Sequence, residues 1–232
     1  MAFLSKPDTT SGAPLLPEQE KPGAATCSAP VKSAGAAKPA PNAFQTQAYW
    51  RRRSDMLYYR YIDYIIRAVG VDAKSMVDVG TGNCPYLEWF DWIPERVSVD
   101  LRNPYSSVTV KGIKGDILKL PLTRKYDICS CLQVLEHVPD AAAFGRRLLE
   151  LSDLVVISVP YKWSTFPKST KGHVHDPVDY EKLTSWMGRT ANYKQIVQEP
   201  FSNTKSQRMI AIYDRDPARK FTHTLAETMV RR

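Results

Sequence analysis

The stretch "MVDVGTGNCPYLEWF", residues 76–90, joins an apolar run to two glycines and then to a segment of helical character. The apolar run is typical of a buried strand and contains Asp78, and Gly80 and Gly82 follow it in a loop. A strand, a loop and a helix in this order place free backbone N–H groups and a helix N-terminus at the carboxyl edge of a sheet. The stretch therefore predicts a nucleotide-binding loop.

Two common nucleotide-binding motifs do not fit this loop. A nicotinamide dinucleotide fingerprint needs a third glycine where Pro85 stands, and the proline ring would crowd the contact between helix and strand. A phosphate-binding P-loop needs the pattern GxxxxGK[ST], which the sequence does not contain. The loop therefore disfavours a dinucleotide and indicates another kind of cofactor.

Strand-like and helix-like segments alternate around the loop. Helical patterns at 85–92 and 140–151 lie among short runs rich in β-branched residues, which are found at 75–80, 96–101, 112–117, 126–131 and 153–160. Three of the runs are apolar enough to be buried on both faces, as parallel strands are. The pattern predicts an α/β doubly wound sheet, with a short link after Asp100 that leaves little room for a helix. Residues 193–201 and 208–216 predict an antiparallel hairpin added to it.

The flanks of this region have a different character. Residues 1–43 are rich in Pro, Ala, Ser, Gly and Lys, which predicts a disordered leader before a domain at 44–215. The domain should open with one amphipathic helix ending at Gly70, with Trp50, Leu57, Tyr61, Tyr64, Ile65 and Ala68 on its apolar stripe. Residues 216–232 predict a helical tail capped by Asp216 and Pro217. Its apolar stripe should pack on the domain or form a homodimer.

The composition narrows the class of protein. The chain has 232 residues, a formal net charge of +8 and four cysteines, with no pattern of metal-binding cysteine pairs. Its first residues lack the apolar core of a signal peptide, and no run of eighteen apolar residues occurs, so a cytoplasmic protein with no membrane span is expected. Cys129 and Cys131 should be reduced core residues on one face of a strand. The positive charge favours anionic partners.

Carboxylates follow successive predicted strands. Asp100 ends the second strand, where a carboxylate can accept bonds from both ribose hydroxyls, and Asp116 follows the third, where it can meet an adenine amino group. The fourth strand leads into "CLQVLEHVPD", residues 131–140. With these motifs in this order, the chain over residues 75–160 resembles the class I S-adenosylmethionine-dependent methyltransferases, especially the small UbiE/UbiG-like branch.

The resemblance implies a Rossmann-like sheet of seven strands with a reversed C-terminal hairpin, and S-adenosylmethionine as cofactor. It also implies positions for the cofactor-binding residues. Gly80 and Gly82, with Asp78 just before them, would lie at the methionine portion, and Asp100 at the ribose. The adenine would meet Asp116 and Ile117, and the inner side of the cofactor would meet Leu132 and Gln133. Cys84 stands where the family loop usually has a third glycine.

Methyl transfer to a hydroxyl needs a base for the acceptor proton, and that base contributes roughly 10²–10⁴-fold to the rate. His173 and His175 fall in the long loop after the fifth strand, where substrate residues gather in this fold. In an extended backbone they would face the same way, so His175, or failing that His173, is the predicted base. His137 is expected to be structural or close to the cofactor. No third ligand accompanies the His-x-His pair, so no metal site is predicted.

The sequence thus predicts a methyltransferase that uses S-adenosylmethionine to methylate a hydroxyl of a small molecule or glycan. Two alternatives stay open. The basic charge fits a nucleic-acid methyltransferase, although no RNA-binding signature occurs. The departure at Cys84 and the two flanking tails fit a non-catalytic methyltransferase-like partner subunit.

Overall fold

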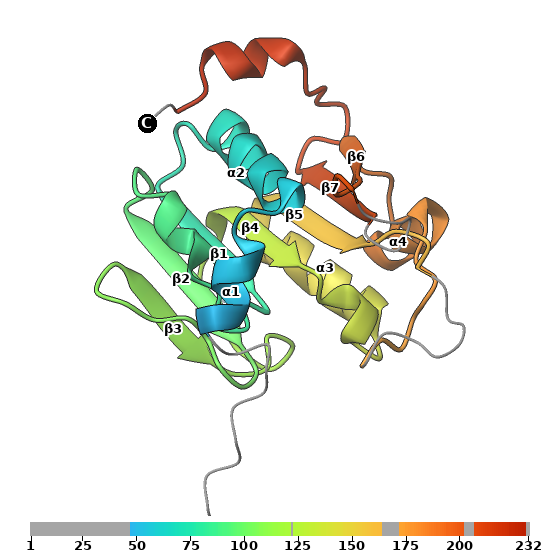
Figure 1. The fold of residues 1–232 in the computed structure, drawn as a ribbon, viewed down its shortest axis with the longest axis horizontal. Helices are drawn as coiled ribbons and strands as arrows, with labels where there is room; N and C mark the ends of the chain where they lie inside the picture. Colours follow the sequence, from blue (N-terminus) through green and yellow to red (C-terminus); the bar gives the residue numbers. More distant parts are fainter. Residues whose placement is uncertain (1–46, 122, 164–171, 202–206, 231–232) are drawn as a thin grey trace, which may run out of the picture. The chain divides into compact units, whose positions relative to one another are not determined.

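Seven strands form one sheet in the order β3-β2-β1-β4-β5-β7-β6, and β7 runs antiparallel to both of its neighbours (Figure 1). The computed structural model describes residues 47–121, 123–163, 172–201 and 207–230. In chain order the strands are Ser75–Val79, Glu95–Asp100, Val110–Lys114, Tyr126–Leu132, Ser152–Pro160, Tyr193–Val197 and Arg208–Asp214. The predicted seven-stranded sheet with a reversed hairpin is confirmed. The predicted leader, residues 1–43, lies outside the described residues.

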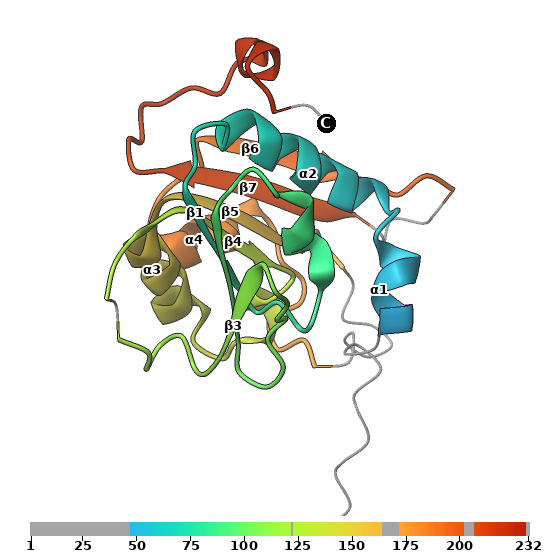
Figure 2. The same cartoon turned by 90° about the vertical axis from the view of Figure 1, so that its left-hand side faces the viewer.

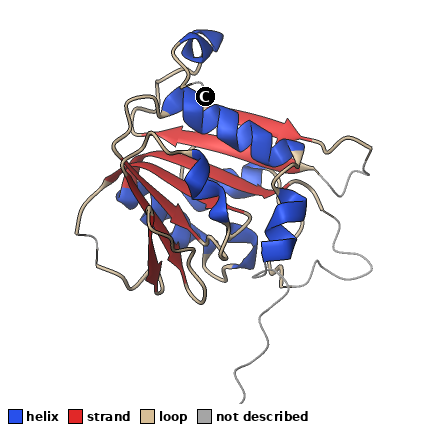
Figure 3. Cartoon of the chain, turned by 60° about the vertical axis from the view of Figure 1, so that its left-hand side comes forward, coloured by secondary structure: helices blue, strands red, loops and turns tan. Residues whose placement is uncertain are grey.

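Helices cover both faces of the sheet (Figures 2 and 3). On one face lie α2 (Leu57–Val69) and the 3-10 helix η2 (Pro85–Trp89), and on the other lie α3 (Ala141–Leu151) and α4 (Tyr180–Met187). Neighbouring β1 residues take opposite sides, because side chains alternate along a strand: Met76 packs with α2, and Val77 with α3. The two apolar layers fix the sheet whose carboxyl edge carries the site.

The connections between strands follow the sequence pattern with one exception. No helix occurs in residues 101–109, as the short link after Asp100 predicts, and α3 begins within a residue of its predicted start. The predicted helix at 85–92 is instead the five-residue 3-10 helix η2, which begins at Pro85 after an extended Cys84. Cys129 and Cys131 are fully buried in β4 as free thiols on one face, as predicted.

The N-terminal helix is divided, where the sequence pattern predicted one continuous helix. A break at residues 54–56 separates α1 (Gln47–Arg53) from α2. At the break, the Ser54 hydroxyl donates to the carbonyl of Arg51 at 3.0 Å, a local bond that competes with helix continuation. The carboxylate of Glu199 accepts bonds from the N–H groups of Leu57 and Tyr58 at 2.9 and 3.1 Å, so α2 is capped by a distant side chain.

The buried face of α2 matches the predicted stripe only in part, because Ile65 and Ala68 are buried as predicted and other predicted positions are not. Leu57, Tyr61 and Tyr64 are 36 to 48% exposed, whereas the fully buried positions include Tyr58 and Ile62. The helix sequence is apolar or aromatic over most of its circumference. The charged residues Arg60, Asp63 and Arg67 lie on one side of the helix. Leu57 and Tyr64 lie at the edge of the apolar arc, and the fully buried Tyr58 and Ile62 lie nearer its centre.

The C-terminal tail does not form the helix predicted to begin at Pro217. Asp216 accepts a bond from the N–H of Ala218 in a turn, and the helix that follows is the short 3-10 helix η5 (His223–Glu227). The Asn192 side-chain amide donates to the carbonyls of Asp216 and Arg219 at 2.8 and 3.0 Å. The Asp216 carbonyl also accepts from the N–H of Arg219 at 3.1 Å, which is the bond of a turn between residues three apart and not the bond between residues four apart that an α-helix requires.

The tail packs on its own domain. Phe221 and Leu225 line a cavity of about 250 Å³ together with Tyr64 of α2, and the N–H of Val230 donates to the carbonyl of Arg67 at 3.3 Å. This arrangement supports packing on the domain and gives no support to the alternative, a homodimer. No helix within the described ranges combines the length and apolar character that a membrane crossing requires.

Candidate functional site

The glycine loop takes backbone conformations that suit glycine at two positions. Gly80 and Gly82 have φ of +87° and +57°, and a Cβ on Gly80 would lie 2.4 Å from a methyl carbon of Val134. Cys84, which stands at the family's third glycine, has φ of −80° and therefore needs no glycine. The loop thus forms without the third glycine, and the Cys84 side chain is buried beneath it.

Asp100 organises the end of β2. One carboxylate oxygen accepts from the N–H of Gly82 at 3.0 Å, and the other accepts from the N–H groups of Arg102 and Asn103 at 2.7 and 2.8 Å. A carboxylate offers about four acceptor positions, so it can still accept from a ligand while holding the loop. Asp100 lies where the sequence predicts, and it also caps the neighbouring backbone.

A cavity of about 610 Å³ lies beside this carboxylate, and we call it the Asp116 cavity. It is lined by Asp100, Asp116, Ile117 and Gly80 together with Phe144 and Val134. One Asp116 oxygen accepts from the N–H of Leu118 at 3.0 Å, which turns the chain after β3. The structure therefore brings the predicted ribose and adenine residues together at one cavity.

Asp78 lies beneath the loop and lines neither this cavity nor the next. It is 2% exposed and accepts bonds from the hydroxyls of Ser130, at 2.6 Å, and Tyr86. Burial raises the pKa of the Asp78 carboxyl to about 6, and these hydrogen bonds oppose the shift. The structure thus places Asp78 as a support that ties the loop strand to η2 and β4.

Leu132 and Gln133 separate at the end of β4. Gln133 has a left-handed φ of +58°, lines the second cavity described below and donates to the Ser158 hydroxyl at 3.2 Å. Leu132 packs against the apolar cluster on the α2 side and lines neither cavity. The geometry therefore favours Gln133 over Leu132 as a ligand contact.

A second cavity, of about 490 Å³, adjoins the first, and we call it the Trp163 cavity. Gly80, Asp100, Arg102 and His137 line both. The rest of its wall is aromatic and charged, from Tyr49, Trp50, Arg53, Tyr58, Tyr59, Gln133, Glu136, Trp163, His173 and Arg208. A group bound at the glycine loop would therefore face a chamber that can hold a second molecule.

His173 and His175 diverge, contrary to the prediction that they share a direction, because the segment bends between them. His173 lines the Trp163 cavity and stacks on Trp163 with ring centroids 5.8 Å apart. The Nε2 atom of His175 donates to the carbonyl of Val138 at 2.7 Å, and its ring packs beside Trp186. The structure thus places His175 outside the cavity and His173 inside it.

Asp176, three residues after His173, holds the ring of His173. The Nδ1 atom of His173 lies 2.8 Å from an Asp176 oxygen, with the two side chains 5% and 1% exposed. Because a carboxylate oxygen accepts, Nδ1 carries the proton and the lone pair of the neutral ring is on Nε2. The pair is a base with an orienting carboxylate.

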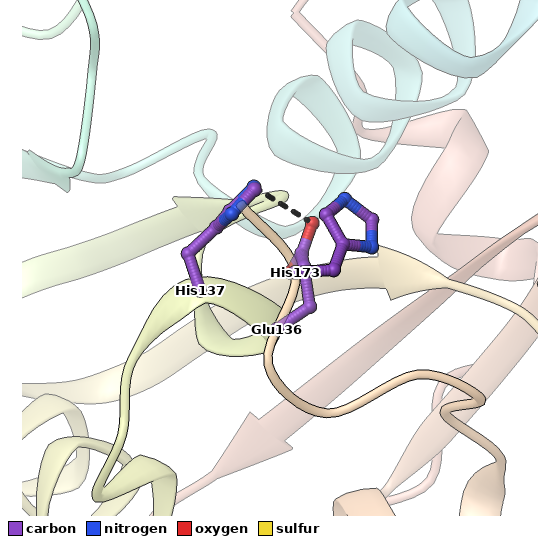
Figure 4. Close-up of side chains that lie close together, drawn as sticks. All are labelled: Glu136, His137 and His173. Atoms are coloured by element: carbon purple, nitrogen blue, oxygen red, sulfur yellow. Dashed lines mark ion pairs between the residues drawn. The ribbon is translucent and has the colours of Figure 1, made fainter. Parts of the chain in front are cut away.

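Glu136 and His137 reach the same wall from the 3-10 helix η3 (Leu135–His137) after β4. Figure 4 shows the Glu136 carboxylate between the rings of His137 and His173, whose centroids lie 4.6 Å apart. Burial raises the pKa of the Glu136 carboxyl to about 8, and burial lowers the pKa of the His137 imidazole below its ordinary value. The sequence could not pair them with His173, because His137 and Gly172, the residue before His173, are 35 positions apart in the chain.

A larger hollow, of about 1120 Å³, lies at the opposite ends of the strands. Asp127, Asp153 and Asp214 line it, and it contains no residue of the glycine loop. Ligands of doubly wound sheets bind outside the carboxyl ends of the strands. The two adjoining cavities at that edge are therefore the candidate site.

Comparisons with known proteins support the fold. No protein-family model matches the chain, and a comparison with curated proteins finds no match. Among solved structures, the chain is similar to the N-methyltransferase NodS from Bradyrhizobium japonicum WM9, solved with S-adenosyl-L-homocysteine. The TM-score is 0.57 and the identity 12%, over 74% of this chain and 93% of NodS.

Two further structures are similar. A Haloferax volcanii methyltransferase solved with the activator Trm112 has a TM-score of 0.56 and 11% identity, over 74% of this chain and 96% of that one. Magnesium protoporphyrin IX methyltransferase from Synechocystis PCC 6803, with bound S-adenosylhomocysteine, has a TM-score of 0.50 and 17% identity, over 68% and 82%. At these identities the likeness establishes the fold, that of class I S-adenosylmethionine-dependent methyltransferases.

Proposed function

We propose that the chain transfers a methyl group from S-adenosylmethionine to a hydroxyl of a small molecule or glycan. The observation that carries the proposal is that His173, oriented by Asp176, lines a cavity which shares Gly80 and Asp100 with the Asp116 cavity. The sulfonium donor and a base for the acceptor would therefore meet at one wall. NodS and the Synechocystis enzyme were solved with the product of the same donor, which supports the choice of cofactor.

The cofactor would lie across the carboxyl edge of the sheet. Its adenine would occupy the Asp116 cavity beside Ile117, and its ribose would meet the remaining acceptor positions of Asp100. The methionine portion would lie along Gly80 and Gly82, which line the Trp163 cavity. The Trp163 cavity, which shares Gly80 and Asp100 with the Asp116 cavity, would then hold the acceptor.

Methyl transfer from a sulfonium is an in-line displacement, so the protein mainly holds the acceptor about 3 Å from the methyl carbon and excludes water. The acceptor hydroxyl must lose its proton, and the Nε2 lone pair of His173 can take it. Asp176 stabilises the imidazolium that forms, because its carboxylate accepts the Nδ1 proton.

The wall of the Trp163 cavity also bears on the acceptor. Arg53, Arg102 and Arg208 line it, against the carboxyls of Asp100 and Glu136. Arg208 is paired with Glu199 at 3.9 Å, and burial raises the pKa of the Glu136 carboxyl to about 8. Below that pH, the Arg53 and Arg102 guanidinium groups therefore outnumber the Asp100 carboxylate and favour an acceptor that carries negative charge. The Trp163 ring offers a face for stacking. The same positive charge is the observation that favours the second candidate, a nucleic-acid acceptor.

The decisive experiment is transfer of a radiolabelled methyl group from S-adenosylmethionine into fractionated extract of the native source. Label in a small, nuclease-resistant product, stable as an ether, is the expected result. Label that nuclease releases from a polymer would favour the nucleic-acid reading, and label on nitrogen would refute O-methylation. Cofactor binding without transfer to any fraction would favour a non-catalytic partner subunit, and absence of cofactor binding would refute the proposal as a whole.

A further inference from the structure

Three side chains with metal-ligating atoms converge on the wall of the Trp163 cavity. The ligand atoms of Glu136, His137 and His173 all lie within 4.8 Å of one another, and all three residues line the cavity (Figure 4). Glu136 and His137 come from η3, and His173 comes from the segment after β5. Two parts of the chain that are distant in sequence thus build one cluster of two imidazoles and a carboxyl.

Both imidazoles present the same nitrogen to the cluster. The Nδ1 atom of His137 lies 2.8 Å from the carbonyl oxygen of Gly172, and the Nδ1 atom of His173 lies 2.8 Å from Asp176. Carbonyl and carboxylate oxygens accept, so each neutral ring carries its proton on Nδ1 and its lone pair on Nε2. Metal-binding histidines are held in this way, with the other ring nitrogen bonded to a carboxylate or a backbone carbonyl.

The third member is an acidic side chain with no hydrogen bond to account for its burial. Glu136 is 0% exposed, and neither of its carboxyl oxygens has a hydrogen-bond partner among the described residues. The nearest ring nitrogen, Nε2 of His137, lies 3.8 Å from Oε1, which is beyond hydrogen-bonding distance. Burying a polar group without a partner is costly, and a ligand that bonds to these oxygens would remove that cost.

We infer that Glu136, His137 and His173 bind a divalent transition-metal ion through one carboxylate and two Nε2 atoms. Two imidazoles favour zinc, manganese, cobalt or ferrous iron over magnesium and calcium, which prefer oxygen ligands. Metal–nitrogen bonds of about 2.0–2.1 Å would bring the ligand atoms to roughly 3 Å from one another. The His137 side chain is 41% exposed, so it can turn inward to close that distance.

The use of this ion in catalysis rests on the proposed function, whereas its binding does not. An acceptor hydroxyl bound to such an ion in the Trp163 cavity would have a lowered pKa and would release its proton to solvent water, as metal-bound water does. His173 would then act as a ligand, because its Nε2 lone pair cannot hold an ion and a proton together. Asp176 would keep the same role in either case, orienting the ring.

The test measures metal binding directly, without cofactor or acceptor. The full chain, free of affinity tag and stripped of metal, is titrated with Co²⁺ by visible absorption and with Zn²⁺ by calorimetry. The variants Glu136→Gln, His137→Ala and His173→Ala each remove one ligand, and Asp176→Asn removes the orienting charge. His175→Ala and His223→Ala are matched controls, because His175 bonds to Val138 outside the cluster and His223 lies in η5. Thermal unfolding of every variant checks the fold.

The expected result is one equivalent of bound metal, with affinity lowered at least about tenfold in each ligand variant and about 10–100-fold in Asp176→Asn. Affinity should not change in the two controls. Binding that survives all three ligand substitutions, or that a control substitution abolishes, overturns the site, and so does an absence of binding at millimolar metal. If Glu136→Gln fails to fold, the His137→Ala variant tests the site, because the His137 side chain is partly exposed and its removal should leave the fold intact.

Two outcomes separate this inference from the proposed reaction. No metal binding together with methyl transfer that withstands a chelator would leave His173 as a simple base. Metal binding without methyl transfer to any acceptor would keep the site and remove the reaction. If both hold, chelation should stop turnover, and added Zn²⁺ or Mn²⁺ should restore it in the native chain.

Discussion

The indole Nε1 of Trp50 donates to the carbonyl of Gly82 at 3.1 Å, which joins α1 to the glycine loop. Trp50 also lines the Trp163 cavity and meets the ring of Tyr59 edge-on. A helix that precedes the sheet in sequence therefore bounds the candidate site. Trp50 and Gly82 are 32 positions apart in the sequence, so no local sequence pattern predicts this contact.

The Trp50→Phe variant should bind S-adenosylhomocysteine about fivefold more weakly, because one part-buried hydrogen bond contributes about 1 kcal/mol. The phenyl ring keeps most of the packing, so the melting temperature should change little. Calorimetric titration provides the measurement. Trp92→Phe is a matched control, since that indole donates to the carbonyl of Gly70, away from both cavities. Equal losses of affinity in the two variants would contradict a specific role for Trp50.

The Asp100→Ala variant should lower cofactor affinity by about 10–100-fold, since hydrogen bonds to a charged group contribute about 1.5–3 kcal/mol. Part of the loss comes from the loop, which loses its acceptor for Gly82. Asp127→Ala is the control, because Asp127 accepts from the N–H groups of Lys74 and Ser75 at the opposite end of the strands. It should lower stability and leave the affinity of the folded protein unchanged. Unaltered affinity in Asp100→Ala would remove Asp100 from the cofactor site.

The His173→Ala variant should lower turnover by roughly 10²–10⁴-fold while cofactor affinity stays nearly constant, because the lost interaction acts in the transition state. His175→Ala should lose its contacts with Val138 and Trp186, and so some stability, with turnover retained. Single-turnover assays with the identified acceptor measure both. The reverse ranking would restore His175 as the base, and a threefold or smaller loss in the double variant would exclude both.

The free energy of unfolding should decrease as pH rises from about 4 through the pKa of Asp78, which is about 6 in the folded protein. Burial raises its pKa to about 6 from an ordinary value of 3.8, so the folded protein binds more protons than the unfolded chain between those values. The free energy of unfolding should decrease by up to about 3 kcal/mol from pH 4 to pH 7 on this account. Glu136 contributes in the same direction at higher pH, because its pKa is also raised.

The Asp78→Asn variant isolates the contribution of this carboxyl, because an amide oxygen can still accept from Tyr86 and Ser130. Urea unfolding at a series of pH values should show a flatter profile in the variant between pH 4 and pH 6. Parallel profiles for the two proteins would show that Asp78 ionises in the folded state as readily as in the unfolded chain.

The fold could be predicted from the sequence, because the sequence patterns that indicate a doubly wound sheet are local. Apolar runs indicate buried strands. Asp100 and Asp116 could be assigned to the candidate site because the carboxyl ends of parallel strands lie at one edge of the sheet. Hydrophobic periodicity was less precise on α2, where apolar and aromatic side chains cover more than half of the circumference of the helix. It assigned Tyr64 to the core, although this residue is 48% exposed.

The predictions that failed concern features that depend on the folded backbone and on contacts with other segments, which local sequence patterns do not show. Asn192 holds the turn that stands where the tail helix was predicted to begin, and Glu199 caps the start of α2. The partner of His173 is Asp176, three residues ahead, and this pairing depends on a bend that spacing does not reveal. Likewise, His137 meets His173 only in the folded chain.

Because Cys84 is buried, the reactivity of its thiol reports the opening of the glycine loop. Its thiol is 5% exposed, and burial raises its pKa to about 12, so a thiol reagent reacts with it only when the loop opens. Cys129 and Cys131 lie deeper, in β4, and should open only with the sheet. With Cys27 replaced by Ser, the rate of Cys84 labelling therefore measures the free energy of local opening. A ligand that closes the loop should slow that rate in proportion to its occupancy.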